Sequence, residues 1–172
     1  MRPLETRYAL ALLELTRNEE ALTKGAALVQ GDPDLWRALN NPCVSREEKD
    51  RVLCRLLQGM VEGEVLSFFR LLCDRERLEL LPAIVKEYHR LKLEEEGGAQ
   101  GVYRCARQPH PEDLSRLEEG IKRRHGLSKV ELQVVLDPEL LGGFVLQIQG
   151  VTYDKSVQGM LRGLRRSLKE RD

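Results

Sequence analysis

The chain has 172 residues, of which 41% are hydrophobic and 5% aromatic, enough to fill one or two small cores with mainly aliphatic side chains. Its 28 basic and 28 acidic residues give a formal net charge of zero. This balance argues against a non-specific nucleic-acid binder, which needs an excess of cations to neutralise phosphates.

The first hundred residues carry apolar side chains at helical spacing, interrupted by short breaks. Asp32 and Pro33 are typical of a helix start, because proline at the first helical position loses no hydrogen bond. Ser45 and Glu48 fit a capping box before another helix. We expect six helices, over about residues 4–15, 18–31, 33–39, 45–57, 64–72 and 82–91. Short links between short helices favour a helical bundle, since no such helix is stable alone.

After residues 94–98 the apolar period changes from helical to alternating. The pattern predicts strands near 102–106, 130–136 and 144–149, a helix between Pro111 and Gly126, and a last helix from about Asp154. Val157, Leu161, Leu164 and Leu168 form the apolar side of that last helix. The fold class is therefore predicted to be α+β, with a six-helix bundle at 1–105 and a small α/β domain at 106–172.

Gly142 and Gly143 lie between a turn that starts at Asp137-Pro138 and the third strand. A phosphate-binding loop would precede a helix instead, so this pair does not indicate an anion site. We expect at least one of the two glycines to have a positive φ, because the turn must lead directly into the strand.

Catalytic and metal-binding patterns are absent from the sequence. The four cysteines form no C-x-x-C pair, and the three histidines, His89, His110 and His125, lie in charged or turn segments. We therefore expect no catalytic residue, no cofactor and no metal site. A small enzyme with a Cys/His pair and a helical RNA-binding regulator remain as alternatives. The lack of converging polar groups weighs against the enzyme, and the zero net charge weighs against the regulator.

Two basic clusters end helices. In residues 122–125 the charges suit the negative end of a helix, which we favour over nucleic-acid contact. The basic residues of the last helix fit the same interpretation, and they could also form a rim for an acidic partner. The sequence starts with charged residues and has no apolar run of about 20 residues, so we expect a cytosolic protein that meets a membrane only through a partner.

Apolar residues on the first and fifth helices extend beyond one narrow stripe. The first has Tyr8 and Leu12 on one side and Leu13 on another, and the fifth has both Phe68 and Phe69. This pattern suggests that both helices bury a second face, against a partner helix.

Several motifs carry a family resemblance. They are Arg7-Tyr8-Ala9-x-Ala11-Leu12, Leu39-Asn40-Asn41-Pro42 with Lys49, Phe68-Phe69-x-Leu71-Leu72, Asp137-Pro138-Glu139-Leu140-Leu141-Gly142-Gly143 and Asp154-Lys155-Ser156-Val157. With these motifs the chain resembles the delta subunit of bacterial ATP synthases, the family of the mitochondrial oligomycin-sensitivity-conferring protein. The resemblance spans nearly the whole chain.

The resemblance implies a non-catalytic stator subunit that links the catalytic head to the peripheral stalk. It implies that an alpha-subunit N-terminal helix binds a groove between the first and fifth helices, lined by Tyr8, Leu12, Phe69 and Leu72. It also implies that the C-terminal domain holds the b-subunit stalk. Leu161, Leu164, Arg165 and Leu168 are the residues expected there. The implied location is the cytoplasmic face of the bacterial cell membrane, with membrane contact only through the complex.

Overall fold

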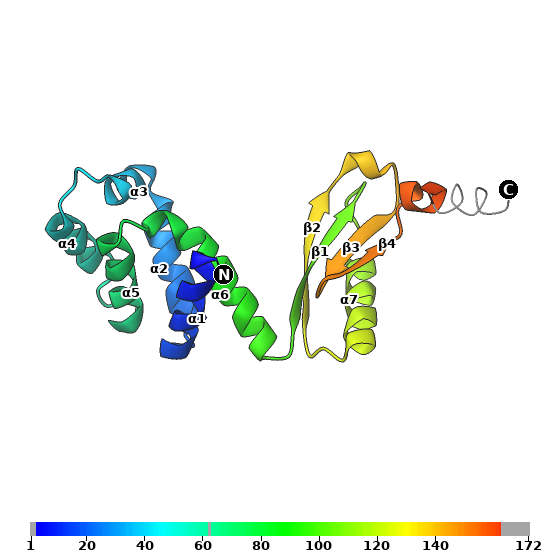
Figure 1. Ribbon diagram of the computed structural model, residues 1–172, viewed down its shortest axis with the longest axis horizontal. Coiled ribbons are helices and arrows are strands. Elements are labelled where there is room, and N and C mark those ends of the chain that lie inside the picture. Colours follow the sequence, from blue (N-terminus) through cyan, green and yellow to red (C-terminus); the bar gives the residue numbers. More distant parts are fainter. Residues whose placement is uncertain (1–2, 62, 163–172) are drawn as a thin grey trace. The chain divides into compact units, whose positions relative to one another are not determined.

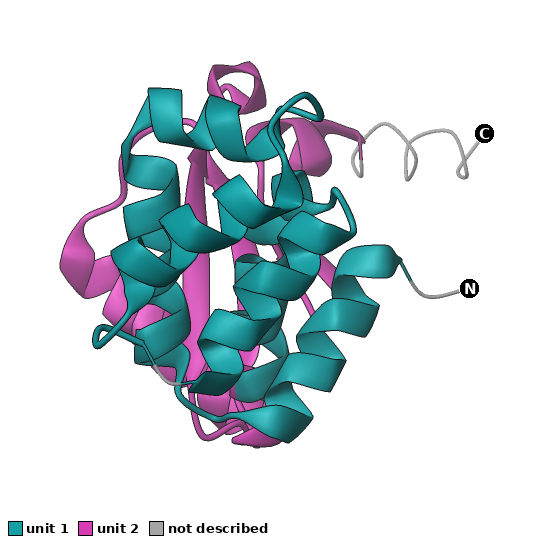
Figure 2. Cartoon of the chain, turned by 90° about the vertical axis from the view of Figure 1, so that its left-hand side faces the viewer, with its two compact units in different colours: residues 1–92 teal, residues 93–172 magenta. Residues whose placement is uncertain are grey.

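The computed structural model describes residues 3–61 and 63–162. The chain divides into two compact units, Met1–Lys92 and Leu93–Asp172, coloured separately in Figure 2. The first unit is helical and the second combines helix and sheet, which confirms the predicted α+β class. The division lies before the expected boundary between residues 105 and 106. The physical reason is that the strand preceding residue 106 is hydrogen-bonded inside the sheet of the second unit.

The helices of the first unit follow the predicted ranges closely (Figure 1). They are α1 (Leu4–Leu15), α2 (Glu19–Gly31), α3 (Pro33–Asn40), α4 (Arg46–Leu57), α5 (Gly63–Asp74), the short 3-10 helix η1 (Leu78–Leu80) and α6 (Leu81–Glu95). Their starts have local causes. The Asp32 carboxylate accepts hydrogen bonds from the backbone of Asp34 and Leu35, and Ser45 and Glu48 form both bonds of a capping box.

One hydrophobic core joins these helices. It contains buried side chains from α1 to α6, among them Leu12, Leu22, Leu53 and Phe69. Gly25 of α2 allows the close packing, since a β-carbon there would lie 3.0 Å from the Phe69 ring. Burial of these side chains is the main stabilising contribution available to the short helices. That α1 to α6 form the six-helix bundle of the family stays a prediction.

The second unit is built on a four-stranded sheet in the described residues, in the order β2-β1-β3-β4. The strands are β1 (Ala99–Cys105), β2 (Val130–Leu136), β3 (Phe144–Ile148) and β4 (Val151–Asp154). β1 pairs in parallel with β2, which requires a crossover, and α7 (Pro111–His125) supplies it. The pairs of β3 with β1 and with β4 are antiparallel. A short 3-10 helix, η2 (Pro138–Leu140), lies between β2 and β3.

Among the described strands, β4 is the one that the sequence pattern did not predict. It follows β3 through Gln149 and Gly150, which both have positive φ, at 48° and 76°. This conformation is that of a two-residue hairpin turn, whose twist matches the twist of the flanking strands. Because β4 is short and mostly exposed, its apolar alternation is weak.

The core of the second unit lies between α7 and the sheet. Ile121 of α7 packs with Tyr103, Leu146 and Ile148 of the strands. Gly126 ends α7 with φ of 65°, as its position in the sequence predicts. A further helix begins after β4, and residues 157–162 of it are helical. In the described part of the chain, no helix is both long enough and apolar enough to cross a membrane.

Candidate functional site

An apolar groove lies between the end of α1 and the start of α5. It has a volume of about 490 Å³ and is lined by Leu15, Gly63, Glu64, Ser67, Phe68 and Leu71. Leu15 is 68% exposed and Leu71 is 42% exposed, while Phe68 is nearly buried beneath them. Large exposed aliphatic side chains around a buried aromatic ring are typical of a surface that a partner covers.

The residues expected at the head-binding groove lie on α1 and α5, mostly on the inner faces of these helices. Leu12, Phe69 and Leu72 have no exposed surface and belong to the core, whereas Tyr8 is half-buried. The Tyr8 ring packs edge-on against Phe68, with 6.2 Å between ring centroids. Arg77 donates a 2.8 Å hydrogen bond to the Tyr8 hydroxyl, which fixes that ring. None of the four expected residues therefore lines the groove: Leu12, Phe69 and Leu72 belong to the core, and Tyr8 contacts Phe68, which does line it.

In the second unit, the two most specific motifs of the sequence are in contact. The backbone N–H of Lys155 donates to the carbonyl of Phe144 at 2.9 Å, and that of Val157 donates to the carbonyl of Gly142 at 3.1 Å. Gly143 has φ of 73°, which confirms the expectation of a positive φ at this pair. A β-carbon on Gly143 would lie 2.2 Å from the Lys155 carbonyl oxygen. Only glycine fits here.

Asp154 and Ser156 start the helix that follows β4. The Asp154 carboxylate accepts hydrogen bonds from the hydroxyl and the backbone N–H of Ser156, at 2.6 and 2.9 Å. These bonds hold the pKa of Asp154 below its usual range. The Ser156 hydroxyl in turn accepts from the backbone of Gly159 at 2.9 Å. The motif therefore fixes the direction in which this helix leaves the sheet.

An exposed apolar patch surrounds this junction. Its members are Leu141 at 74% exposure, Met160 at 59%, Leu161 at 57% and Val157 at 41%. Leu161 was expected at a partner surface, and the structure places it in this patch. Leu164, Arg165 and Leu168 lie outside the described residues. Leu141 and Met160 were not identified from the sequence. Leu141 lies in a turn segment, whereas Met160 follows Val157 by three positions, so the apolar stripe of the predicted last helix could have indicated it.

Two of the three histidines and the buried Cys73 have structural surroundings. His89 pairs with Glu19 at 2.5 Å, and His125 is hydrogen-bonded to the Tyr153 hydroxyl at 2.9 Å. Burial raises the pKa of the Cys73 thiol to about 11. In residues 3–61 and 63–162, no three metal-ligating side chains are grouped to hold an ion.

Comparison with known proteins identifies one family over nearly the whole chain. The family described as ATP synthase delta (OSCP) subunit matches residues 4–168. The ATP synthase subunit delta of Gloeobacter violaceus is 35% identical over 166 residues, which cover 92% of this chain and 90% of that protein. The ATP synthase subunit delta of Acetivibrio thermocellus is 28% identical over 178 residues, which cover 99% of this chain and 100% of that protein.

The fold also matches a solved structure. A chain in the cryo-EM structure of the Toxoplasma gondii mitochondrial ATP synthase hexamer superposes with a TM-score of 0.72 at 18% identity. The match covers 97% of this chain and 98% of that one. The chain therefore belongs to the ATP synthase delta (OSCP) subunit family, a family of non-catalytic stator subunits.

Proposed function

We propose that this chain links the catalytic head of an ATP synthase to its peripheral stalk through two separate surfaces. The supporting observation is that each compact unit has its own core and exposes its own apolar surface. These surfaces are the groove between α1 and α5 and the patch around Leu141 and Leu161. An adaptor that resists rotor torque needs partner contacts that dissociate slowly, and apolar burial provides them.

The head-binding surface in this proposal is the groove of the first unit, formed by a six-helix bundle within residues 1–105. Its occupant is the N-terminal helix of an alpha subunit. The exposed side chains of Leu15 and Leu71 would contact the apolar face of that helix, with Phe68 beneath it. Tyr8 lies beside Phe68, while Leu12, Phe69 and Leu72 keep α1 and α5 at the required separation.

The stalk-binding surface is the patch of the second unit, in the domain that ends at residue 172. Its occupant is the end of the b-subunit stalk. Leu161 belongs to the exposed patch, and Leu164 and Leu168 continue the same sequence stripe, which Arg165 flanks. The complex would hold the chain at the cytoplasmic face of the bacterial membrane, with no direct membrane contact.

Calorimetry with a peptide of the alpha-subunit N-terminus tests the head contact. Leu71→Asp places a charge in the groove, where a bound helix would leave it unpaired, so we expect affinity to fall at least about tenfold. Val52→Asp on α4 is the matched control, since Val52 has a similar exposure of 41% and lies outside the groove. Equal affinities of the two variants, both folded, would place the head contact elsewhere.

A further inference from the structure

A polar cavity in the first unit lies where α3, α4, α5 and η1 meet. It has a volume of about 180 Å³ and is lined by Leu39, Asn40, Pro42, Lys49, Cys73, Glu76, Leu78 and Glu79. A site for one water needs only about 15 Å³, so a molecule of several heavy atoms fits here. Leu39, Asn40, Pro42 and Lys49 belong to one sequence motif, which neither surface of the proposed function uses.

Lys49 is buried although no side chain pairs with its charge. It is 5% exposed, and among residues 3–61 and 63–162 it is the one buried side chain that carries a charge. The Lys49 ammonium forms no hydrogen bond or ion pair with a described residue. Within that part of the chain no polar side-chain atom is both sealed from solvent and without a partner, so this ammonium reaches the open space of the cavity. Lysine is rarely buried unless its charge is paired, so an anion that enters the cavity would be stabilised there.

Helix formation does not require a cation at this position. Lys49 is the fourth residue of α4, in the turn that carries the positive end of the helix dipole. A positive side chain is unfavourable there, and the capping box of Ser45 and Glu48 already satisfies the helix start. The dipole and the Lys49 ammonium therefore both favour an anion at the floor of the cavity.

The mouth of the cavity carries the opposite charge. Glu76 and Glu79 line it with exposed side chains, and neither forms an ion pair with a described residue. The Asn40 amide donates a 2.9 Å hydrogen bond to the Trp36 carbonyl, which fixes this side chain in the wall. The cavity thus has a positive floor and a negative mouth before any ligand binds, and such preorganisation favours binding.

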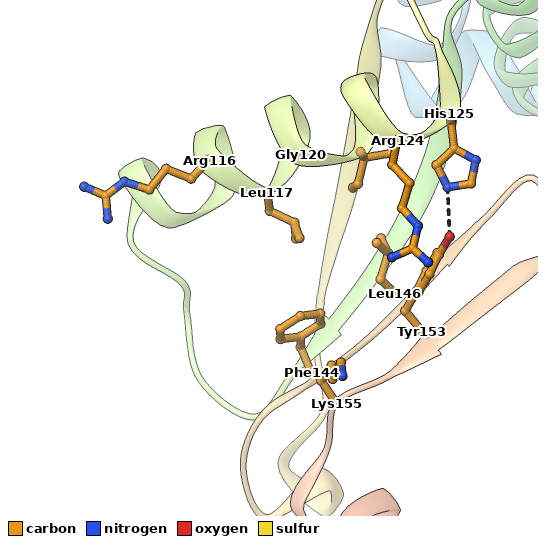
Figure 3. Close-up of a pocket in the computed structure, with 10 residues that line it drawn as sticks. Arg116, Leu117, Gly120, Arg124, His125, Phe144, Leu146, Tyr153 and Lys155 are labelled. Atoms are coloured by element: carbon orange, nitrogen blue, oxygen red, sulfur yellow. Dashed lines mark hydrogen bonds between the residues drawn. The ribbon is translucent and has the colours of Figure 1, made fainter.

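A cavity in the second unit shows a different placement of charge. It lies between α7 and the strands β3 and β4, and Arg116, Arg124 and Lys155 are among the side chains that line it (Figure 3). All three are exposed. Arg116 extends away from the apolar walls, and Arg124 lies 5.2 Å from the centre of the Tyr153 ring (Figure 3). Because these cations remain in water, they do not indicate a ligand as the buried Lys49 does.

We propose that the cavity at Lys49 binds a small straight-chain zwitterion, with a carboxylate at one end and an ammonium at the other. The carboxylate pairs with the Lys49 ammonium at the floor, and the ammonium of the ligand pairs with Glu76 or Glu79 at the mouth. Leu39 and Leu78 contact the apolar chain between the two ends. The site takes part in neither partner contact of the proposed function, so its test is independent of them.

Three four-carbon acids serve as probes, because they differ mainly in the group at the far end. They are 4-aminobutyrate, butyrate and succinate. Chemical-shift titration of the nitrogen-15-labelled full chain should give saturable shifts at the amides of Asn40, Lys49 and Glu76. We expect 4-aminobutyrate to bind at least about threefold more tightly than butyrate, and succinate to bind most weakly, since the mouth repels a second carboxylate. No saturable shift with any of the three, or tightest binding of succinate, would overturn the proposal.

Two variants locate the charges that matter. Lys49→Met keeps the length of the side chain and removes a buried charge, and it should weaken 4-aminobutyrate and butyrate at least about tenfold. Lys86→Met is the control, because Lys86 is exposed on α6 and does not line the cavity. The double variant Glu76→Gln and Glu79→Gln alters only exposed side chains, so it should fold, keep butyrate binding and lose the preference for 4-aminobutyrate. Unchanged binding in folded Lys49→Met, or an unchanged preference in the double variant, would contradict the proposal.

Discussion

The hydroxyl of Tyr88 on α6 donates a hydrogen bond of 2.8 Å to the backbone carbonyl of Thr16, at the end of α1. Both residues are buried, and 72 positions of sequence separate them. The bond satisfies a carbonyl that the end of α1 leaves outside its own helical pattern. It also fixes the segment beside Leu15, which lines the groove of the first unit. The position of the proposed head-binding surface thus depends on a contact with α6.

Tyr88→Phe should destabilise the first unit by about 1–2 kcal/mol, because the buried Thr16 carbonyl loses this donor. Urea unfolding followed by circular dichroism measures the change. Tyr103→Phe is the matched control, since the Tyr103 hydroxyl has no hydrogen-bond partner in the described residues. Equal losses of unfolding free energy for both substitutions would show that the surroundings of the ring, and not the hydrogen bond, determine the effect.

Stability should depend on pH through Glu19, whose carboxylate pairs with His89 and Lys92. Partial burial raises the pKa of Glu19, but hydrogen bonds from His89 and Lys92 outweigh burial and leave the pKa below its ordinary value. Ionised Glu19 therefore stabilises the fold above the unfolded pKa of about 4.3, and the contribution is lost as the pH falls through the lowered folded pKa.

Glu19→Gln should accordingly cost about 0.5–1 kcal/mol at neutral pH, a modest value because solvent screens the pair. The variant should also show a shallower loss of stability on acidification than the wild type. Melting curves between pH 7 and about pH 3 measure both effects. Glu14→Gln is the control, because Glu14 is exposed and has no partner within residues 3–61 and 63–162. If stability fell equally with pH in the wild type and in Glu19→Gln, the stabilising role of ionised Glu19 would be contradicted.

Gly143→Ala should destabilise the second unit by about 2 kcal/mol or more, since it adds a steric clash to an unfavourable φ. Gly150→Ala separates the two causes. Gly150 also has a positive φ, of 76°, but a β-carbon there would meet nothing within 4 Å. We expect Gly150→Ala to cost about 1 kcal/mol, from the backbone conformation alone. Thermal unfolding measures the stability of both variants. A smaller loss of stability for Gly143→Ala than for Gly150→Ala would refute the steric explanation.

The cysteines should differ strongly in reactivity. All four are free, with Cys43 exposed and Cys73 buried. Because burial raises the pKa of Cys73 to about 11, its reactive thiolate is scarce at neutral pH. Brief treatment with iodoacetamide, followed by mass spectrometry, should label Cys43 and leave Cys73 unmodified. Early labelling of Cys73 in the folded chain would mean that α5 opens far more readily than a packed core helix does.

The sequence was most informative where a side chain acts on its own backbone. Asp32 and Ser45 cap helices as predicted, and the Gly143 turn follows from its place between a proline turn and a strand. These effects are local, so residue type and spacing suffice to predict them. The alternating pattern likewise predicted β2 and β3 within a residue or two.

The sequence was least informative about which helical face is exposed. Neighbouring residues on a helix point about 100° apart, so Phe68 and Phe69, although both buried, have different surroundings. Phe69 faces the core beside Gly25, whereas Phe68 reaches the groove. Likewise, the patch around Leu141 forms only when two segments distant in the chain come together. Such surfaces depend on tertiary packing, which periodicity does not specify.

The most direct test of the two-surface account is the mass of complexes formed from soluble head, full-length chain and soluble b fragment, measured by native mass spectrometry. The wild type should form one complex that contains all three. Leu71→Asp should keep the b fragment and lose the head, and Leu161→Asp should keep the head and lose the b fragment. Loss of both partners in either folded variant, or a complete complex in both, would contradict the claim that the chain joins head and stalk through two independent surfaces.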